Sequence, residues 1–89
     1  MKRYFIALDR LYFKGCEHLE LFALYKLEGI LCGLCSIPCN TKLYGCEIAG
    51  IFAVFIADCD EEHYKTFIDS IEKIYPGINK FIHVSVKES

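Results

Sequence analysis

Apolar and polar residues follow one another in blocks whose periodicity changes from strand-like to helical and back. Residues 3–9, RYFIALD, form a short aromatic and aliphatic run with polar ends, which is typical of a strand buried on most of both faces. In residues 17–28 the apolar side chains recur at three- and four-residue spacing, and acidic residues lie early. Gly29 follows, so we expect an amphipathic helix that ends there.

The middle of the chain predicts two further strands that are joined by a long loop. Residues 31–37 form a second apolar run, which Pro38 closes, and residues 48–57, IAGIFAVFIA, are apolar on both faces. The connection between them, residues 38–47, PCNTKLYGCE, is longer than a tight hairpin requires. A connection of that length favours a functional loop.

A second helix and a last strand are predicted towards the C-terminus. Asp58 or Asp60 can cap a helix whose first turn carries two glutamates, where the helix dipole favours negative charge. Its inner stripe is formed by Tyr64, Phe67, Ile68, Ile71 and Ile74 or Tyr75. A Pro-Gly pair at 76–77 ends this helix, and the alternation in residues 80–87 predicts a half-exposed edge strand.

The order β-α-β-β-α-β predicts an α+β, ferredoxin-like fold, in which a four-stranded antiparallel sheet carries both helices on one face. We expect a single domain over residues 1–89, with the first and third strands at its centre. In the third strand the even positions suit packing under the helices, and the odd positions, which include Ile51 and Phe55, suit the open face. The reverse assignment stays open. Either way one apolar sheet face is uncovered, which predicts a homodimer with Ile51 and Phe55 at its interface.

Composition and charge narrow the classes of function. The chain has 89 residues, 54% of them hydrophobic and 15% aromatic, which is more apolar surface than so small a domain can bury. This excess also predicts a partner. A formal net charge of −2 argues against a nucleic-acid partner, because binding to phosphates needs a basic surface. The longest apolar run is far shorter than the about 20 residues of a membrane-spanning helix, so we expect a cytoplasmic protein without a membrane partner.

Six cysteines define the chemistry that the chain could carry. In a reducing cytoplasm, cysteines are more often free, metal-bound or catalytic than paired in disulfides. Cys32 and Cys35 form a C-x-x-C unit, and with Cys39 and Cys46 this unit could supply four thiolates to zinc or to an iron–sulfur cluster. Because residues three apart on a strand point to opposite faces, we expect neither a bound metal nor a cofactor.

Several residues around the cysteines follow the pattern of a known family. These are Gly29 and Ile30 at the end of the first helix, Leu34 and Pro38 in the second strand, and Cys46, Ile48, Ala49 and Phe52 at the start of the third. In this pattern the chain resembles the selenium/sulfur carrier-like proteins, which are small ferredoxin-like domains. Two positions depart from the family, since Cys39 stands where it has arginine and Glu47 where it has glycine.

The resemblance implies a protein that holds or relays sulfane sulfur or selenium on a loop cysteine. Such a carrier needs an accessible thiolate that forms a persulfide or selenyl sulfide and releases it again. We expect Cys46 to be this thiol and Cys39 to resolve it, and these two should be the most reactive cysteines. Gly45 would let a substrate approach the sulfur, and Lys42 would offset the charge of Glu47.

Two alternatives to the carrier hypothesis stay open. Cys39 and Cys46 could be small apolar fillers at the mouth of a loop. The protein could also be a non-enzymatic dimeric interaction or regulatory module, such as a ligand sensor or a phage-type inhibitor, that binds a protein partner through its surfaces. The sequence has no glycine-rich phosphate loop and no Ser-His-Asp pattern, so no catalytic motif favours an enzyme. The sequence alone leaves open whether the protein is an enzyme.

Overall fold

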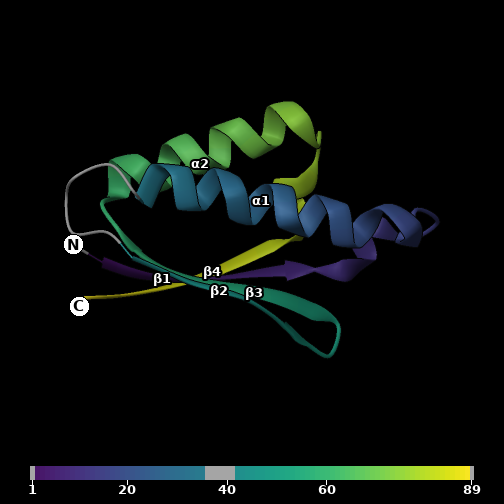
Figure 1. Cartoon of the computed structure of the whole chain (residues 1–89), viewed down its shortest axis with the longest axis horizontal. Coiled ribbons are helices and arrows are strands. Elements are labelled where there is room, and N and C mark those ends of the chain that lie inside the picture. The colour runs from purple at the N-terminus through teal and green to yellow at the C-terminus, as the bar shows by residue number, and fades with distance from the viewer. Residues whose placement is uncertain (1, 36–41, 89) are drawn as a thin grey trace.

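The computed structural model describes residues 2–35 and 42–88, with the backbone alone for 34, 35 and 42–46. Within them, one four-stranded antiparallel sheet in the order β2-β3-β1-β4 carries two α-helices on one side (Figure 1). The elements are β1 Lys2–Asp9, α1 Glu20–Cys35, β2 Lys42–Ala49, β3 Phe52–Cys59, α2 Glu61–Ile74 and β4 Ile82–Glu88. This is the predicted ferredoxin-like α+β fold. The central place of the first and third strands is confirmed.

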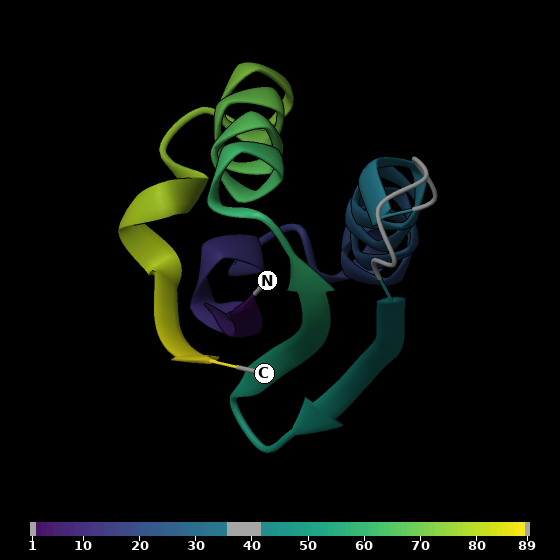
Figure 2. The ribbon, with the colours of Figure 1, turned by 90° about the vertical axis from the view of Figure 1, so that its left-hand side faces the viewer.

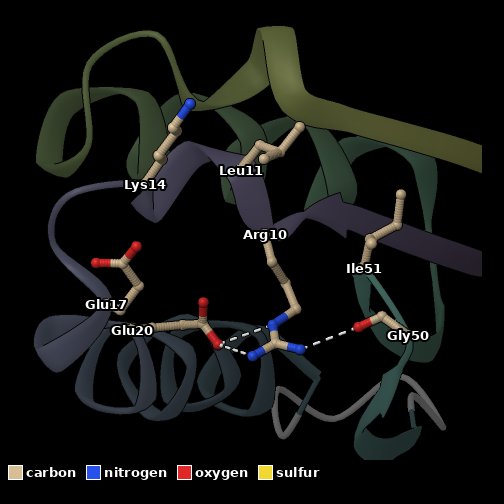
Figure 3. Close-up of a pocket in the computed structure, with 7 residues that line it drawn as sticks. All are labelled: Arg10, Leu11, Lys14, Glu17, Glu20, Gly50 and Ile51. Atoms are coloured by element: carbon tan, nitrogen blue, oxygen red, sulfur yellow. Dashed lines mark hydrogen bonds and ion pairs between the residues drawn. The ribbon is translucent and has the colours of Figure 1, made fainter.

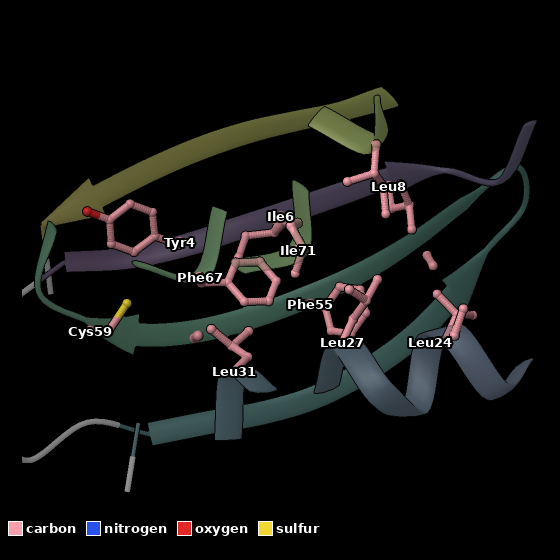
Figure 4. Close-up of a cluster of buried hydrophobic side chains, with 14 of the residues drawn as sticks. Tyr4, Ile6, Leu8, Leu24, Leu27, Leu31, Phe55, Cys59, Phe67 and Ile71 are labelled. Carbon is pink, nitrogen blue, oxygen red and sulfur yellow. The ribbon is translucent and has the colours of Figure 1, made fainter. Parts of the chain in front are cut away.

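The core lies between the sheet and the two helices (Figure 4). Every second residue of β1 faces the helices, and β3 follows the same rule in register, so that Ile6 pairs with Phe55. The core side chains shown in Figure 4 include Tyr4, Ile6 and Leu8 of β1, Leu24, Leu27 and Leu31 of α1, and Phe67 and Ile71 of α2. Each element contributes one apolar side to a single core, as two packed layers require.

The first helix is longer than the sequence predicts. It begins at Glu20, after a 3-10 turn at Glu17–Leu19, and passes through Gly29 to end at Cys35. The predicted strand at 31–37 is therefore wrong for residues 31–35, and residues 36 and 37 lie outside the described part. Leu31 is only 1% exposed. Burial of such a side chain contributes about 2 kcal/mol, which is comparable to the cost of Gly29 and Gly33 inside the helix, roughly 1 kcal/mol each.

Strands β2 and β3 form a tight hairpin where a loop and one long strand are expected. The run 48–57 is divided by a turn at Gly50 and Ile51, and the predicted loop 38–47 becomes strand from Lys42 onward. Gly50 has a φ of +65°, which favours glycine and suits a two-residue hairpin turn. The carbonyl oxygen of Ile51 accepts a hydrogen bond of 2.9 Å from the backbone N–H of Arg10, which ties the turn to the end of β1.

The two faces of β3 are the reverse of the preferred assignment. Its odd positions face the helices, and Phe55 is only 1% exposed, because it stands in register with the buried Ile6 of β1. Phe55 is thus a core residue and is not available on the open face. Ile51 is 61% exposed but lies in the hairpin turn rather than on the sheet. The open face carries the even positions instead, including Val54 and Ile56, which are half-buried.

The second helix is close to the prediction. Asp60 occupies the N-cap position of α2, although its side chain makes no capping hydrogen bond, and Asp58 pairs with Arg3. Gly77, at a φ of +82°, follows the helix end and leads into a 3-10 turn at Ile78–Phe81. Strand β4 therefore starts at Ile82, two residues later than expected at 80.

The stacked rings of Tyr4 and Tyr64 predict a loss of stability in alkali. Their centroids are 4.3 Å apart, and burial, with a smaller contribution from Tyr4, raises the pKa of Tyr64 above its ordinary value. Near pH 10 the unfolded chain loses this proton while the folded chain keeps it, so the free energy of unfolding falls as the pH rises further. Urea titrations between about pH 8 and pH 11 should show this fall, and Tyr64→Phe should reduce it.

Tyr25→Phe is the matched control for this prediction, because Tyr25 is 66% exposed on α1. It measures how much of any change in the alkaline slope a tyrosine-to-phenylalanine substitution causes by itself. An equal slope in the Tyr64→Phe protein would refute the assignment.

Candidate interaction surface

Helix α1 is apolar on both of its sides. Its inner side packs Leu24, Leu27 and Leu31 into the core. On the outer side Phe22 is 71% exposed and Tyr25 is 66% exposed. A helix that is apolar all round is normally covered all round. The outer side of α1 is therefore the first candidate for a binding surface.

We define the α1 outer face by six residues that follow helical spacing. They are Leu21, Phe22, Tyr25, Gly29, Cys32 and Gly33, all of them exposed. Leu21, with 63% of its surface exposed, adds to the aromatic part of this face. Lys26, beside it, is the one charged residue among the exposed positions of α1 that the structure describes. The face is thus long, apolar and nearly uncharged.

The α1 outer face has two halves that differ in the size of their side chains. Its N-terminal half, the large half, carries Leu21, Phe22 and Tyr25, whereas its C-terminal half, the flat half, carries Gly29, Cys32 and Gly33. A Cβ atom added at either glycine would meet no described atom of the chain within 4 Å. The fold therefore does not require glycine at these two positions through close packing against described residues.

An apolar hollow of about 380 Å³ continues the face towards α2. Its walls are Tyr12, Phe13, Cys16, Leu19, Phe22, Ala23 and Tyr75. The hydroxyl of Tyr12 donates to the carbonyl oxygen of Pro76 at 3.1 Å, which fixes one wall. A smaller hollow of about 120 Å³ lies on the other side of α1, where Tyr25 and Ile48 are among its walls. Apolar surface thus extends from α1 in both directions.

A third hollow, of about 310 Å³, has the side chain of Arg10 in its wall (Figure 3). The Arg10 guanidinium contacts Glu20 Oε1 through Nε at 2.8 Å and through Nη2 at 2.7 Å. Its Nη1 donates to the carbonyl oxygen of Gly50 at 3.0 Å. Arg10, the first residue after β1, therefore ties α1 to the β2–β3 turn, and its charge is already paired.

The other charged residues that line this hollow add no net charge. Lys14 and Glu17 are of opposite sign and line its mouth. Backbone N–H groups of Glu17 and Gly15 hold the pKa of the Glu17 carboxyl below its usual value. The four charged side chains that line the hollow therefore sum to zero.

The open face of the sheet is covered in part by its own polar side chains. The Lys87 ammonium lies 5.5 Å from the ring centroid of Phe5. The His83 ring meets Phe52 nearly at right angles, at 5.9 Å between centroids. Phe5, Phe52, Val54 and Ile56 of this face are all half-buried, whereas the aromatic residues of the α1 outer face are exposed. The larger exposed apolar area is therefore on the helix.

The residues predicted for sulfur chemistry fall mainly on β2. Lys42 begins the strand, and the backbone of Cys46 pairs with that of Phe55. The register shifts between Leu43 and Cys46, a stretch that contains Gly45. The side chains of residues 42–46 and the whole of Cys39 lie outside the described part. The structure thus places Cys46 in a strand rather than in a loop.

The other cysteines differ in exposure. Cys16 and Cys32 are exposed and free, whereas Cys59 is buried. Cys32 and Cys35 belong to α1, where residues three apart lie on the same side of the helix. The argument that a strand separates these two thiols and so prevents them from sharing a metal is therefore wrong. Over residues 2–35 and 42–88, no group of three or more His, Cys, Asp or Glu is placed to hold a metal ion.

Comparisons with known proteins leave the site to be judged on its geometry. No protein-family model, curated protein or solved structure matches the chain significantly. The resemblance to the selenium/sulfur carrier-like family stays a hypothesis. None of the helices in the described residues is both long and apolar enough to cross a membrane.

The α1 outer face is the feature that sequence reasoning missed. A signal for it was present, because residues 19–35 contain only three charged side chains and are apolar at both inner and outer helical positions. Ending the helix at Gly29 concealed it, since Cys32 and Gly33 were then assigned to a strand. With the helix continued to Cys35, the same residues form one exposed stripe.

Proposed function

We propose that the protein is a non-enzymatic interaction module that acts through the α1 outer face. The observation that carries this proposal is the exposure of three adjacent large side chains, Leu21, Phe22 and Tyr25, each by about two-thirds. Apolar surface stabilises a complex by about 25 cal/mol for each Å² that is removed from water. A contiguous patch of this kind on a small domain is typical of a site that another macromolecule covers.

The surroundings of the face support the same role. The apolar hollow beside Phe22 can receive a protruding side chain, as pockets at the centre of protein interfaces do. The paired charges of Arg10 and Glu20 hold the N-terminal end of α1 against the hairpin turn. A helix that is fixed in this way loses little conformational entropy on binding, which favours affinity.

The carrier hypothesis receives less support from the fold. It relied on a long loop that presents Cys46, whereas β2 begins at Lys42 and includes this residue. A persulfide or selenium adduct on Cys46 or Cys39 stays the prediction that would favour it. Intact-mass analysis of protein purified from its native cells without reductant would detect such an adduct.

Site-specific photo-crosslinking tests the proposed function. A benzophenone amino acid at position 22 should give a discrete crosslinked product in the cells that make the protein. The same group at position 65 should give none, because Lys65 is exposed on α2, away from the α1 outer face. Adding Gly29→Leu to the position-22 variant should abolish the product, because leucine would fill the flat half of the face.

Each arm of this experiment can contradict the proposal. Products of equal yield from positions 22 and 65 would mean that the crosslinks are non-specific. A product that survives Gly29→Leu would mean that the partner does not cover the flat half. Loss of the product on mutation of Cys46 to serine alone would favour the thiol chemistry instead.

A further inference from the structure

The shape of the α1 outer face is self-complementary. Its large half precedes its flat half by about two helical turns, which separate Leu21 from Gly29 and Tyr25 from Gly33. When two such helices pack antiparallel about a two-fold axis, the large half of each meets the flat half of the other. Small residues let two helices approach closely, and a two-fold interface requires one patch that fits itself.

We infer that the α1 outer face binds a second copy of this chain, with the two α1 helices antiparallel. The inference rests on the proposed function and names its partner. In this arrangement Phe22 lies over Gly33 of the second copy, and Tyr25 lies over its Gly29. The same two-fold axis brings Leu21 opposite Cys32. Every contact occurs twice, so a modest patch is used twice over.

The exposed area agrees with a weak but specific dimer. Leu21, Phe22 and Tyr25, together with Leu19 and Ile48 at the flanks, are between 51% and 71% exposed. Side chains of this size present on the order of 100 Å² each, so the five offer about 500 Å² per copy and about 1,000 Å² for the pair when all are covered. That lies at the lower limit for a specific interface. We therefore expect a dissociation constant in the micromolar range.

Charge also favours a copy of the chain over a strongly charged partner. Lys26 is the one charged exposed position of α1 in the described structure, and its long side chain can reach solvent from the edge of the contact. Lys26 and the partly exposed Glu28 beside the face are of opposite sign, so a strongly acidic or strongly basic partner finds no net complementary charge there. A second apolar face of the same kind requires none.

Analytical ultracentrifugation of the purified full chain tests the inference. The wild-type protein should sediment as a dimer at about 100 µM and dissociate on dilution. Gly29→Leu should weaken the dimer at least tenfold while it keeps or raises the melting temperature, because leucine favours the helix over glycine. Lys65→Leu, which adds the same side chain to the exposed side of α2, should leave the dimer intact.

Disulfide trapping tests the antiparallel register. With Leu21→Cys, mild oxidation should join position 21 of one copy to Cys32 of the other, because their Cα atoms come within the roughly 7 Å that a disulfide spans. Peptide mapping identifies the bond. A bond between the two Cys32 residues would overturn the antiparallel pairing in favour of a parallel one.

Three further results would overturn the inference. One is a wild-type protein that sediments as a monomer at about 100 µM. The proposed function would survive this result if the benzophenone at position 22 still gave a crosslinked product whose mass is not twice that of the chain. Another is an unchanged dimer in Gly29→Leu. The third is a dimer that Ile56→Asp dissociates and Gly29→Leu does not, since Ile56 lies on the open sheet face.

Discussion

Replacing Phe55 with alanine is expected to remove about 3–5 kcal/mol from the free energy of unfolding. Phe55 is among the largest fully buried side chains of the described structure, at 1% exposure, and it stands in register with Ile6 in the centre of the sheet. Truncation removes its contacts and leaves a cavity that rigid strands cannot close. An 89-residue domain has a total of only about 4–13 kcal/mol, so the variant should be near its unfolding limit at 37 °C.

Phe52→Ala is the matched control, because it removes the same side chain from the same strand on the other face. Phe52 is half-buried and meets water beside His83, so its loss should cost about 1–2 kcal/mol. Urea unfolding followed by circular dichroism gives both values. A larger loss for Phe52→Ala than for Phe55→Ala would contradict the observed orientation of β3.

Cys59 is expected to react with iodoacetamide about a thousandfold more slowly than Cys16 and Cys32. Cys59 is 1% exposed at the end of β3, whereas the other two are exposed in the folded chain. A buried thiol reacts only when the structure opens, and opening of a core strand costs at least about 4 kcal/mol. Timed alkylation with peptide mapping measures all of these rates in one sample.

Denaturant supplies the internal control for this measurement. In about 6 M urea the three thiols should react at similar rates, because exposure no longer separates them. Native labelling of Cys59 at the rate of Cys16 would mean that the end of β3 opens readily. The same map yields the rates of Cys46 and Cys39, which the carrier hypothesis predicts to be the fastest.

The order of elements was predictable because each block of the sequence carries its own periodic signal. The alternation of buried residues in β1 and the helical stripe of α2 are both local patterns, and the structure keeps them. The β-α-β-β-α-β order then leaves few ways to close an antiparallel sheet. Fold class therefore followed from local patterns and topology.

The boundaries around α1 and β2 were not predictable in the same way. Residues 31–35 are apolar without a clear period, so a helix and a buried strand are equally compatible with them. The burial of Leu31 between α1 and the rest of the core favours the helix over the strand. This burial is a tertiary contact, which the local sequence does not reveal. At Gly50 the opposite error arises, because a turn glycine was taken for a residue within a strand.

The candidate site depended on these same boundaries. Once residues 31–35 were assigned to a strand, Cys32 and Gly33 could not belong to a helix face, and the connection before Cys46 seemed long enough to be a loop. Faces of β3 were equally undetermined, because an apolar run with no polar side, such as residues 52–57, does not identify its inner positions. The pairing of Phe55 with Ile6 identifies them.

The sheet order has a consequence for how the chain acquires its structure during synthesis. Strand β1 is made before its two neighbours, β3 and β4, and Lys2 pairs with Cys59 on one side and with Glu88 on the other. The nascent β1 therefore has no strand partner until a further 50 or so residues have left the ribosome, and its second edge stays open until β4 emerges. Contacts this far apart in sequence make folding slow, and they leave the apolar side chains and the unpaired backbone of β1 exposed to water in the interval.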